Sequence, residues 1–190
     1  MNGANLICES LRELGVSHVF GLPGTQNVLL YEALRTRGMR SIVASDEGAA
    51  AFMAAGYARA SGRVGVLTTI PGPGFVYALA GIVEAQHDSV PLLWLTLRQA
   101  DNGRAFQLQQ IDQAAMAKPV VKRCMLVDRT DELAQAHGRI NEDDAYKTNR
   151  RNIINSAEKE TATNKYKFLK QTNTPLLFCT RRTSLKYADI

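Results

Sequence analysis

The sequence predicts an α/β fold in which a doubly wound parallel sheet carries helices on both faces. Short apolar runs alternate along the chain with longer segments whose apolar residues recur at helical spacing. The run over residues 91–97 is almost entirely apolar, which is typical of a strand buried on both faces of a sheet. Two turns rich in glycine and proline, at 21–25 and 71–74, lead into helical segments.

The first five elements are predicted from the alternation of these patterns up to Ser61. Thr25 or Asn27 is expected to cap the second helix, because a short polar side chain can accept a hydrogen bond from a free amide. In chain order we expect a helix over 5–14, a strand over 18–20, a helix over 28–37, a strand over 41–44 and a helix over 47–61.

The later elements continue the alternation. We expect a strand over 63–69, a helix over 75–86, the strand over 91–97, a polar loop over 98–110, a short helix over 111–117, a strand over 120–127 and a helix begun by Asp128 or Thr130. Ligands bind such sheets beyond the carboxyl ends of the strands. The unusual residues of this chain gather at those ends, at 21–24, 46–47, 70–74 and 98–99.

Glu47 is the ionisable residue at these ends that is best placed for chemistry. It follows a predicted strand and begins a helix of small residues, where the helix dipole and free amides favour a negative charge. One interpretation is that Glu47 acts on a cofactor and that the helix sets it into a dry interface. The other is that Glu47 only places a charge at a helix N-terminus.

We disfavour a phosphate-binding loop at the two glycine turns. Neither has the Gly-x-Gly-x-x-Gly or the Gly-Lys-Ser/Thr pattern, and Pro23, Pro71 and Pro73 lack the amide hydrogens that would hold a phosphate. They are either tight strand-to-helix turns or the walls of a site where a flat ring meets bare backbone.

Composition limits the class of protein. A chain of 190 residues, 45% hydrophobic, is expected to form one domain with a tail. The net charge of +5 does not predict a nucleic-acid partner, since residues 1–137 hold twelve basic and twelve acidic residues and the excess lies beyond them. No stretch suggests a membrane span or a signal peptide. Three separated cysteines and three histidines predict free thiols in a reducing, cytoplasmic compartment and no metal site.

Four motifs stand in a fixed order along the chain. They are FGLPG at 20–24, DEGAA at 46–50 with GYAR at 56–59, GPG at 72–74 and DSVPL at 88–92. Each is weak alone, but the ordered set resembles the N-terminal pyrimidine-binding domain of thiamine-diphosphate enzymes, above all the acetolactate synthase, benzaldehyde lyase and decarboxylase group. The resemblance covers roughly residues 2–135 and implies the same doubly wound fold.

The resemblance gives Glu47 a catalytic role. In that family the matching glutamate hydrogen-bonds N1′ of the aminopyrimidine of thiamine diphosphate, which favours the imino tautomer that removes the thiazolium C2 proton. The cofactor then reacts with a 2-keto acid or an aldehyde. A glutamate that shares a proton with a ring nitrogen suits apolar surroundings, expected here from Ala49, Ala50, Phe52 and Met53.

Other site residues are implied more weakly. The residues that match the wall of the pyrimidine site are Pro23, Gly24, Ile70 and Gly72. The residues that match the substrate side are Gln99, Phe106 and Gln107. For Phe106 and Gln107, a solvated glutamine-rich loop remains an open alternative.

Three departures from the family pattern put the substrate in doubt more than the cofactor. Asp46 precedes the glutamate where the synthases usually have histidine, and it would raise the proton affinity of Glu47 if it lay close. Tyr77 stands where asparagine is common. Arg98 replaces the glycine of a Gly-Gln pair that often follows the fourth strand.

Family enzymes have a second α/β domain that binds the diphosphate through Mg²⁺ with a Gly-Asp-Gly…Asn signature, which this sequence lacks. Because the cofactor lies between domains of different subunits, we expect this chain to hold half a site and to be inactive alone. The expected partner is a second copy, as a homodimer, or a subunit with a diphosphate-binding domain.

The composition changes after His137, which divides the chain into a pyrimidine-binding domain over 1–137 and a basic tail over 138–190. The fragment TPLLFC at 174–179 resembles the closing strand of the domain, which makes 142–173 an expanded helical connection with a helix around 151–170 and ends the tail with a strand at 175–180. We favour instead a foreign sequence from truncation or a shifted frame. A basic tail that binds RNA is disfavoured because its charges are mixed.

Two functions are therefore compared. In the first, the chain is the cofactor-binding part of a lyase or transferase of the acetolactate synthase type, truncated or split into two subunits. In the second, it is a non-catalytic remnant that serves as an interaction module. In both, the helix over 49–60 is the expected dimer face, with Phe52 and Tyr57 buried by the second copy.

Overall fold

A computed structural model describes residues 2–98, 109–129, 132–133, 135–136 and 138, together with the backbone of 176–181. The elements in chain order are α1 (Gly3–Glu13), β1 (His18–Gly21), α2 (Val28–Thr36), β2 (Arg40–Val43), α3 (Glu47–Ser61), β3 (Gly65–Thr69), α4 (Pro73–His87), β4 (Leu92–Arg98), α5 (Gln113–Ala117), the 3-10 turn Lys118–Val120, β5 (Arg123–Val127) and β6 (Leu176–Arg181).

The six strands form one sheet in the order β2-β1-β3-β4-β6-β5, and every pair is parallel. From β1 the chain moves outward to β2 and then returns to place β3 on the other side of β1. The strand order therefore reverses between β1 and β3, which is the place where ligands bind open α/β sheets. The predicted parallel, doubly wound fold is confirmed.

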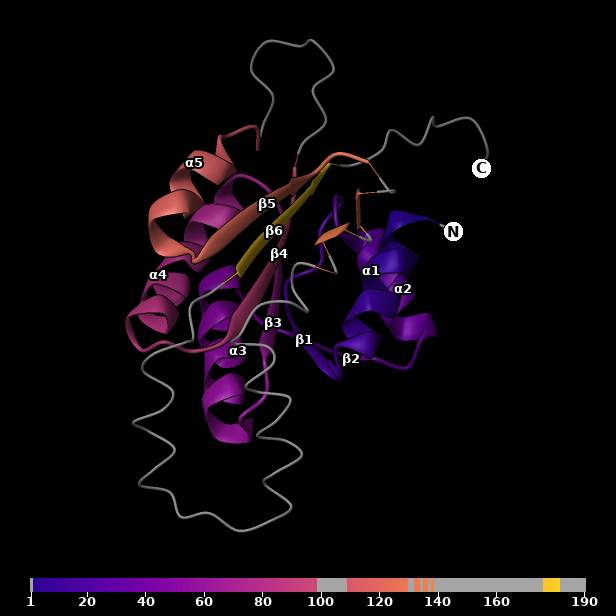
Figure 1. The fold of residues 1–190 in the computed structure, drawn as a ribbon, viewed down its shortest axis with the longest axis horizontal. Helices are drawn as coiled ribbons and strands as arrows, with labels where there is room; N and C mark the ends of the chain where they lie inside the picture. The colour runs from indigo at the N-terminus through magenta and orange to yellow at the C-terminus, as the bar shows by residue number, and fades with distance from the viewer. Residues whose placement is uncertain are drawn as a thin grey trace.

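Helices cover both faces of this sheet (Figure 1). One apolar core lies between the sheet and helices α1 and α2, and includes Leu11, Leu34 and Val66. The other lies between the sheet and helices α3 and α4, and includes Phe75, Leu67 and a row of alanines from α3. Adjacent residues of β3 point into opposite cores, as period-two geometry requires.

The strand predicted to be buried on both faces is β4. Leu93 and Leu95 belong to the core of α1 and α2, whereas Leu92 and Trp94 belong to the core of α3 and α4. The Trp94 ring stacks on Phe75 with ring centroids 4.3 Å apart, and its indole nitrogen donates to Thr69 Oγ1 (3.0 Å). The only polar group of this large side chain is therefore satisfied inside the core.

The predicted boundaries lie within three residues of the observed ones. Helix α1 starts at Gly3 because Asn2, rather than a later residue, caps it by accepting a hydrogen bond from the Asn5 amide (2.9 Å). The strand predicted over 120–127 is shorter than expected. Its first residue, Val120, belongs to the 3-10 turn Lys118–Val120, and pairing begins only at Arg123.

Strand β6 lies between β4 and β5 in the sheet. Its backbone pairs from Leu93↔Leu176 to Arg98↔Arg181 on one side and from Arg123↔Leu176 to Val127↔Thr180 on the other. The fragment that resembles a closing strand therefore pairs as a strand. The connection over 142–173 and its expected helix lie outside the described residues.

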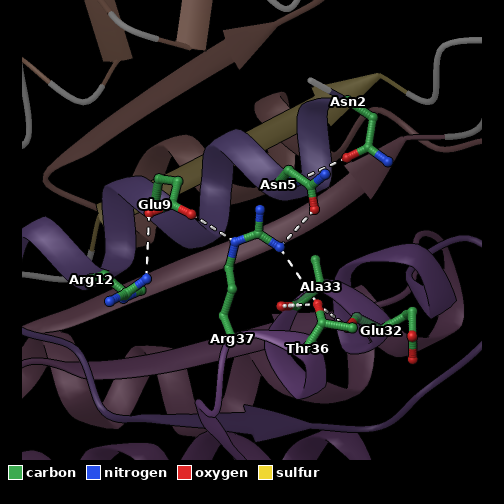
Figure 2. Close-up of polar contacts among 8 residues, drawn as sticks. All are labelled: Asn2, Asn5, Glu9, Arg12, Glu32, Ala33, Thr36 and Arg37. Atoms are coloured by element: carbon green, nitrogen blue, oxygen red, sulfur yellow. Dashed lines mark hydrogen bonds and ion pairs between the residues drawn. The ribbon is translucent and has the colours of Figure 1, made fainter.

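One arginine joins the two helices on the α1/α2 face (Figure 2). Arg37 follows α2, and its guanidinium donates to Glu9 Oε1 (2.8 Å) and to Asn5 Oδ1 (2.9 Å), both on α1. Glu9 also forms an ion pair with Arg12 on its own helix (3.7 Å). The Arg37 side chain is only 19% exposed, so this tie is partly shielded from solvent.

Candidate functional site

The turn after β1 is held by the side chain of Asn27, which is completely buried. Its Oδ1 accepts a hydrogen bond from the Gly24 amide (2.7 Å), and its Nδ2 donates to the Leu22 carbonyl (3.0 Å). Asn27 stands at the N-cap position of α2 but makes no capping bond with its side chain. The predicted capping role is therefore wrong, because the side chain holds the preceding turn instead.

The turn after β3 passes close to another segment of the chain. Gly72 has φ +70°, a backbone conformation that favours glycine, and a Cβ atom there would lie 2.8 Å from Gln109 Cβ and collide with its Cα. The side chains of Gln26 and Gln109 are hydrogen-bonded to each other. Gln109 therefore contacts both turns at the carboxyl edge of the sheet.

Glu47 is the first residue of α3, and its side chain is turned inward. Asp46 caps this helix by accepting a hydrogen bond from the Ala49 amide (2.7 Å) and is exposed, whereas Glu47 is only 4% exposed. A Cβ atom on Gly74 would lie 2.9 Å from Glu47 Cδ and collide with its Oε1. The Glu47 carboxylate thus lies against bare backbone at the start of α4.

Ile70 connects this carboxylate to the other glycine turn. A Cβ atom on Gly24 would lie 2.6 Å from Ile70 Cγ2, and one on Gly74 would lie 2.5 Å from Ile70 Cγ1. Glu47, Gly74, Ile70 and Gly24 are therefore adjacent to one another, although they come from three separate segments. These four residues are called the switch-point cluster below.

The other predicted site residues are placed differently. Pro23 is exposed in the turn before Gly24, and Gly72 lies against Gln109. The three positions predicted on the substrate side, Gln99, Phe106 and Gln107, lie outside the described residues.

The surroundings expected for Glu47 need correction. Phe52 and Met53 are 44% and 40% exposed and do not enclose the carboxylate. Five or six residues along an α-helix bring a side chain to the opposite side from Glu47. Tyr57, expected on an exposed face, packs its ring within the chain against His18 and Phe20.

Two buried hydroxyl groups, one on α2 and one on β3, were not found from the sequence. Tyr31 Oη and Thr68 Oγ1 are buried and have no hydrogen-bond partner among the described residues. Burial raises the pKa of Tyr31, and the charge of Glu47 raises it further. Arg98, which stands where family members often have glycine, is ion-paired with Asp128.

A carboxylate in this position can accept a hydrogen bond from a ligand. No side chain among the described residues donates a hydrogen bond to Glu47, so its oxygens can accept one from a bound group. The bare backbone of Gly74 and Gly24 lets the side chains of Glu47 and Ile70 lie against the two turns. Among the residues that the structure describes, no cluster of His, Cys, Asp or Glu could hold a metal ion. No helix among them is long and apolar enough to cross a membrane.

The family model of the thiamine pyrophosphate enzyme N-terminal TPP binding domain matches residues 1–116. The chain belongs to this family. The match contains the complete switch-point cluster, so the strand reversal and the Glu47 carboxylate lie within the part of the chain that defines the family.

Curated relatives of this TPP-binding domain are acetolactate synthases. The large subunit from Buchnera aphidicola subsp. Schizaphis graminum is 36% identical over 135 residues, which are 70% of this chain and 24% of the relative. Isozyme 3 large subunit from Escherichia coli K12 is 38% identical over 137 residues, 71% and 24% of the two chains. The acetolactate synthase from Bacillus subtilis 168 is 34% identical over 136 residues, which are 70% of this chain and 24% of the relative. The chain thus spans about a quarter of the length of these relatives.

Proposed function

We propose that this chain binds the aminopyrimidine end of thiamine diphosphate and forms half of the active site of an acetolactate synthase-like enzyme that acts on 2-keto acids or aldehydes. Its relatives carry the name of that activity, and its family is a TPP-binding domain. The reaction is a transferase or lyase reaction that forms or breaks a carbon–carbon bond. The free thiols of Cys8 and Cys124 suit a cytoplasmic enzyme.

The observation that carries this proposal is the Glu47 carboxylate in the switch-point cluster. It is buried, it has no donor among the described side chains, and it lies beside the bare backbone of Gly74. A ring nitrogen of an aminopyrimidine can supply the missing hydrogen bond. Glu47 is therefore proposed as the catalytic residue, with Gly24, Ile70 and Gly72 as cofactor-binding residues and Pro23 at the edge of the site.

Thiamine diphosphate supplies the carbanion chemistry when it is bound, and the protein supplies orientation and a proton path. Glu47 would hold a proton between its carboxylate and a ring nitrogen, while Ile70 and the two glycines fix the plane of the ring. We assign the diphosphate and its Mg²⁺ to a second domain, as the resemblance to thiamine-diphosphate enzymes implies.

Exposed apolar side chains on the α3/α4 side support a proposed partner surface there. These two helices pack against each other, and together they expose Phe52, Met53, Val76, Tyr77 and Val83. Such a set of exposed apolar side chains marks an interaction site. We propose that a second copy or a diphosphate-binding subunit covers it; a chain that stays monomeric at high concentration and binds no such subunit would argue against this surface.

The first test is native mass spectrometry of the chain purified from its own cells. We expect a complex with a partner that carries a diphosphate-binding domain and thiamine diphosphate. A lone chain or a homo-oligomer without cofactor would favour the second function, a non-catalytic interaction module. That alternative also uses the exposed α3/α4 side chains, but it needs no Glu47.

The second test separates the two functions by substitution. With the diphosphate-binding domain supplied, Glu47→Gln should lower turnover by at least about 100-fold, because an amide cannot take part in proton transfer. Glu32→Gln is the matched control, since Glu32 is exposed and paired only within its own helix to Arg35. Equal activity of both variants would contradict a catalytic role for Glu47.

A further inference from the structure

Gln109 connects two turns that are far apart in the sequence. Its side chain is hydrogen-bonded to Gln26, which lies in the turn after β1, and its backbone lies against Gly72, in the turn after β3. Gln109 and Gly72 both have positive φ angles, +75° and +70°. Glutamine rarely adopts this conformation, and backbone strain of this kind gathers at ligand sites. A strained residue at the ligand edge of the sheet therefore calls for a functional explanation.

The segment that begins with Gln109 is also fixed at its other end. Gln113 is only 2% exposed, and its Nε2 donates to Thr96 Oγ1 (2.8 Å) on β4. The side chain of Asp112 caps helix α5, which begins at Gln113. Strands β1, β3 and β4 are neighbours in the sheet, so residues 109–113 pass along the carboxyl ends of three adjacent strands.

The same two turns carry the switch-point cluster. Gly24 lies two residues before Gln26, and Gly74 lies two residues after Gly72. The Ile70 side chain lies against both: its Cγ2 is 2.6 Å from a Cβ atom built on Gly24, and its Cγ1 is 2.5 Å from one built on Gly74. Ile70 can keep both contacts only while the two turns stay at this separation.

We propose that Gln109 is a positioning residue that holds the two glycine turns at the separation that the switch-point cluster needs. This inference rests on the proposed function, because it names what keeps the walls of that cofactor site in place. Gln109 acts through the turns and takes no part in the reaction. A site whose walls are already in place loses less freedom when it binds a ligand, so the effect should fall on cofactor affinity and not on the rate of the reaction.

The first measurement uses the full 190-residue chain without cofactor, labelled with ¹³C in the isoleucine methyl groups. The Ile70 signals are assigned by their loss in Ile70→Val. The nuclear Overhauser effect between the Ile70 Cγ2 methyl and the Gly24 Hα protons should weaken in Gln109→Ala and in Gln26→Ala. Gln109→Glu should retain it, because a carboxylate oxygen still accepts the hydrogen bond from Gln26 Nε2.

Gln110→Ala is the matched control, because Gln110 is the next residue along the chain and is exposed. The stacked rings of Phe75 and Trp94, with centroids 4.3 Å apart, provide an internal check, since their contact should persist in every variant that folds. An unchanged Overhauser effect in Gln109→Ala would overturn the proposal, and so would an equal loss in Gln110→Ala or in Gln109→Glu.

The second measurement uses the enzyme assembled with its diphosphate-binding domain. Gln109→Ala should raise the thiamine diphosphate concentration that gives half-maximal turnover by about tenfold and leave kcat within about twofold of the wild type. A fall in kcat without a change in that concentration would contradict the positioning role.

The two proposals can fail separately. If Glu47→Gln abolishes turnover but the Overhauser effect does not respond to Gln109→Ala, only this inference fails. If the Overhauser effect responds but Glu47→Gln leaves turnover intact, only the proposed function fails.

Discussion

Gly74 determines where the Glu47 carboxylate can lie. A methyl group at this position would meet both the carboxylate and Ile70 Cγ1, which is 2.5 Å from the site of the added carbon. We expect Gly74→Ala to displace the carboxylate and to lower turnover of the assembled enzyme by about 100-fold, since a shift near 1 Å has such effects on positioned groups. Steady-state kinetics with the partner domain supplied measures this loss.

The control for this substitution is Gly56→Ala. Gly56 lies within α3, and a Cβ atom there would meet nothing within 4 Å. The substitution should raise the free energy of unfolding by about 0.5–1 kcal/mol through helix propensity and leave the position of Glu47 unchanged. If Gly56→Ala lowered turnover as much as Gly74→Ala, the cause would not be the contact with Glu47.

Cys8 should make the fold sensitive to alkali. Burial raises the pKa of its thiol from 9.0 to about 11; Arg37 lowers it and Glu9 raises it, both by smaller amounts. Between these values the unfolded chain loses a proton that the folded chain keeps, so the free energy of unfolding falls as the pH rises, by up to about 1.4 kcal/mol per pH unit. Urea unfolding of the wild type and Cys8→Ala from about pH 8 to 11 measures the slope. The slope should be shallower in Cys8→Ala, and equal slopes would count against the prediction.

At the residue scale, the sequence singled out Glu47 as a candidate because the motif around it stands in a fixed order with the others, and its role stays a prediction. Its contact with Gly74 could have been suspected from the GPG motif at 72–74, since a glycine at the first turn of a helix leaves space for a neighbour. The hydroxyls of Tyr31 and Thr68 gave no such signal. Their position depends on β1 lying between β2 and β3, which a local pattern does not show.

Among the elements, the joint between α1 and α2 depends on one side chain. Arg37→Ala should lower the free energy of unfolding by roughly 1–2 kcal/mol, because it removes partly buried bonds to Glu9 and Asn5. Arg35→Ala should cost less than about 0.5 kcal/mol, since its bond to Glu32 is exposed and local. Urea denaturation of both variants at neutral pH provides the comparison. If both variants lowered the free energy of unfolding by similar amounts, the bonds of Arg37 to α1 would stabilise the fold no more than an exposed ion pair does.

Helix α3 shows how far an element can be predicted. Its alanines indicated a helix that approaches its neighbours closely, and Ala50, Ala51 and Ala54 are completely buried against α4 and the sheet. The sequence did not show which side remains open, because small residues occupy nearly the whole circumference. The exposed side of Phe52 and Met53 follows from the positions of β3 and α4, which are set by the topology.

For the molecule as a whole, the parallel sheet and its ligand edge were predictable because apolar strands and helices alternate strictly from residue 18 to 98. The position of the last strand was not. A strand at the end of the chain can add at an edge or insert between others, and local patterns do not distinguish these outcomes. In the structure β6 inserts between β4 and β5, so β5 joins the described sheet through β6 alone.

This insertion makes residues 176–181 part of the sheet, and truncation tests it. A chain that ends at residue 175 lacks β6, so β5 loses its backbone partners and β4 loses one side of its pairing. Its free energy of unfolding should fall by roughly 3 kcal/mol or more, since many backbone hydrogen bonds are lost together. A chain that ends at residue 181 keeps every described pair and should be as stable as the full chain. Urea unfolding of the three lengths decides between a closing strand and a foreign tail, because a foreign tail predicts equal stability for all of them.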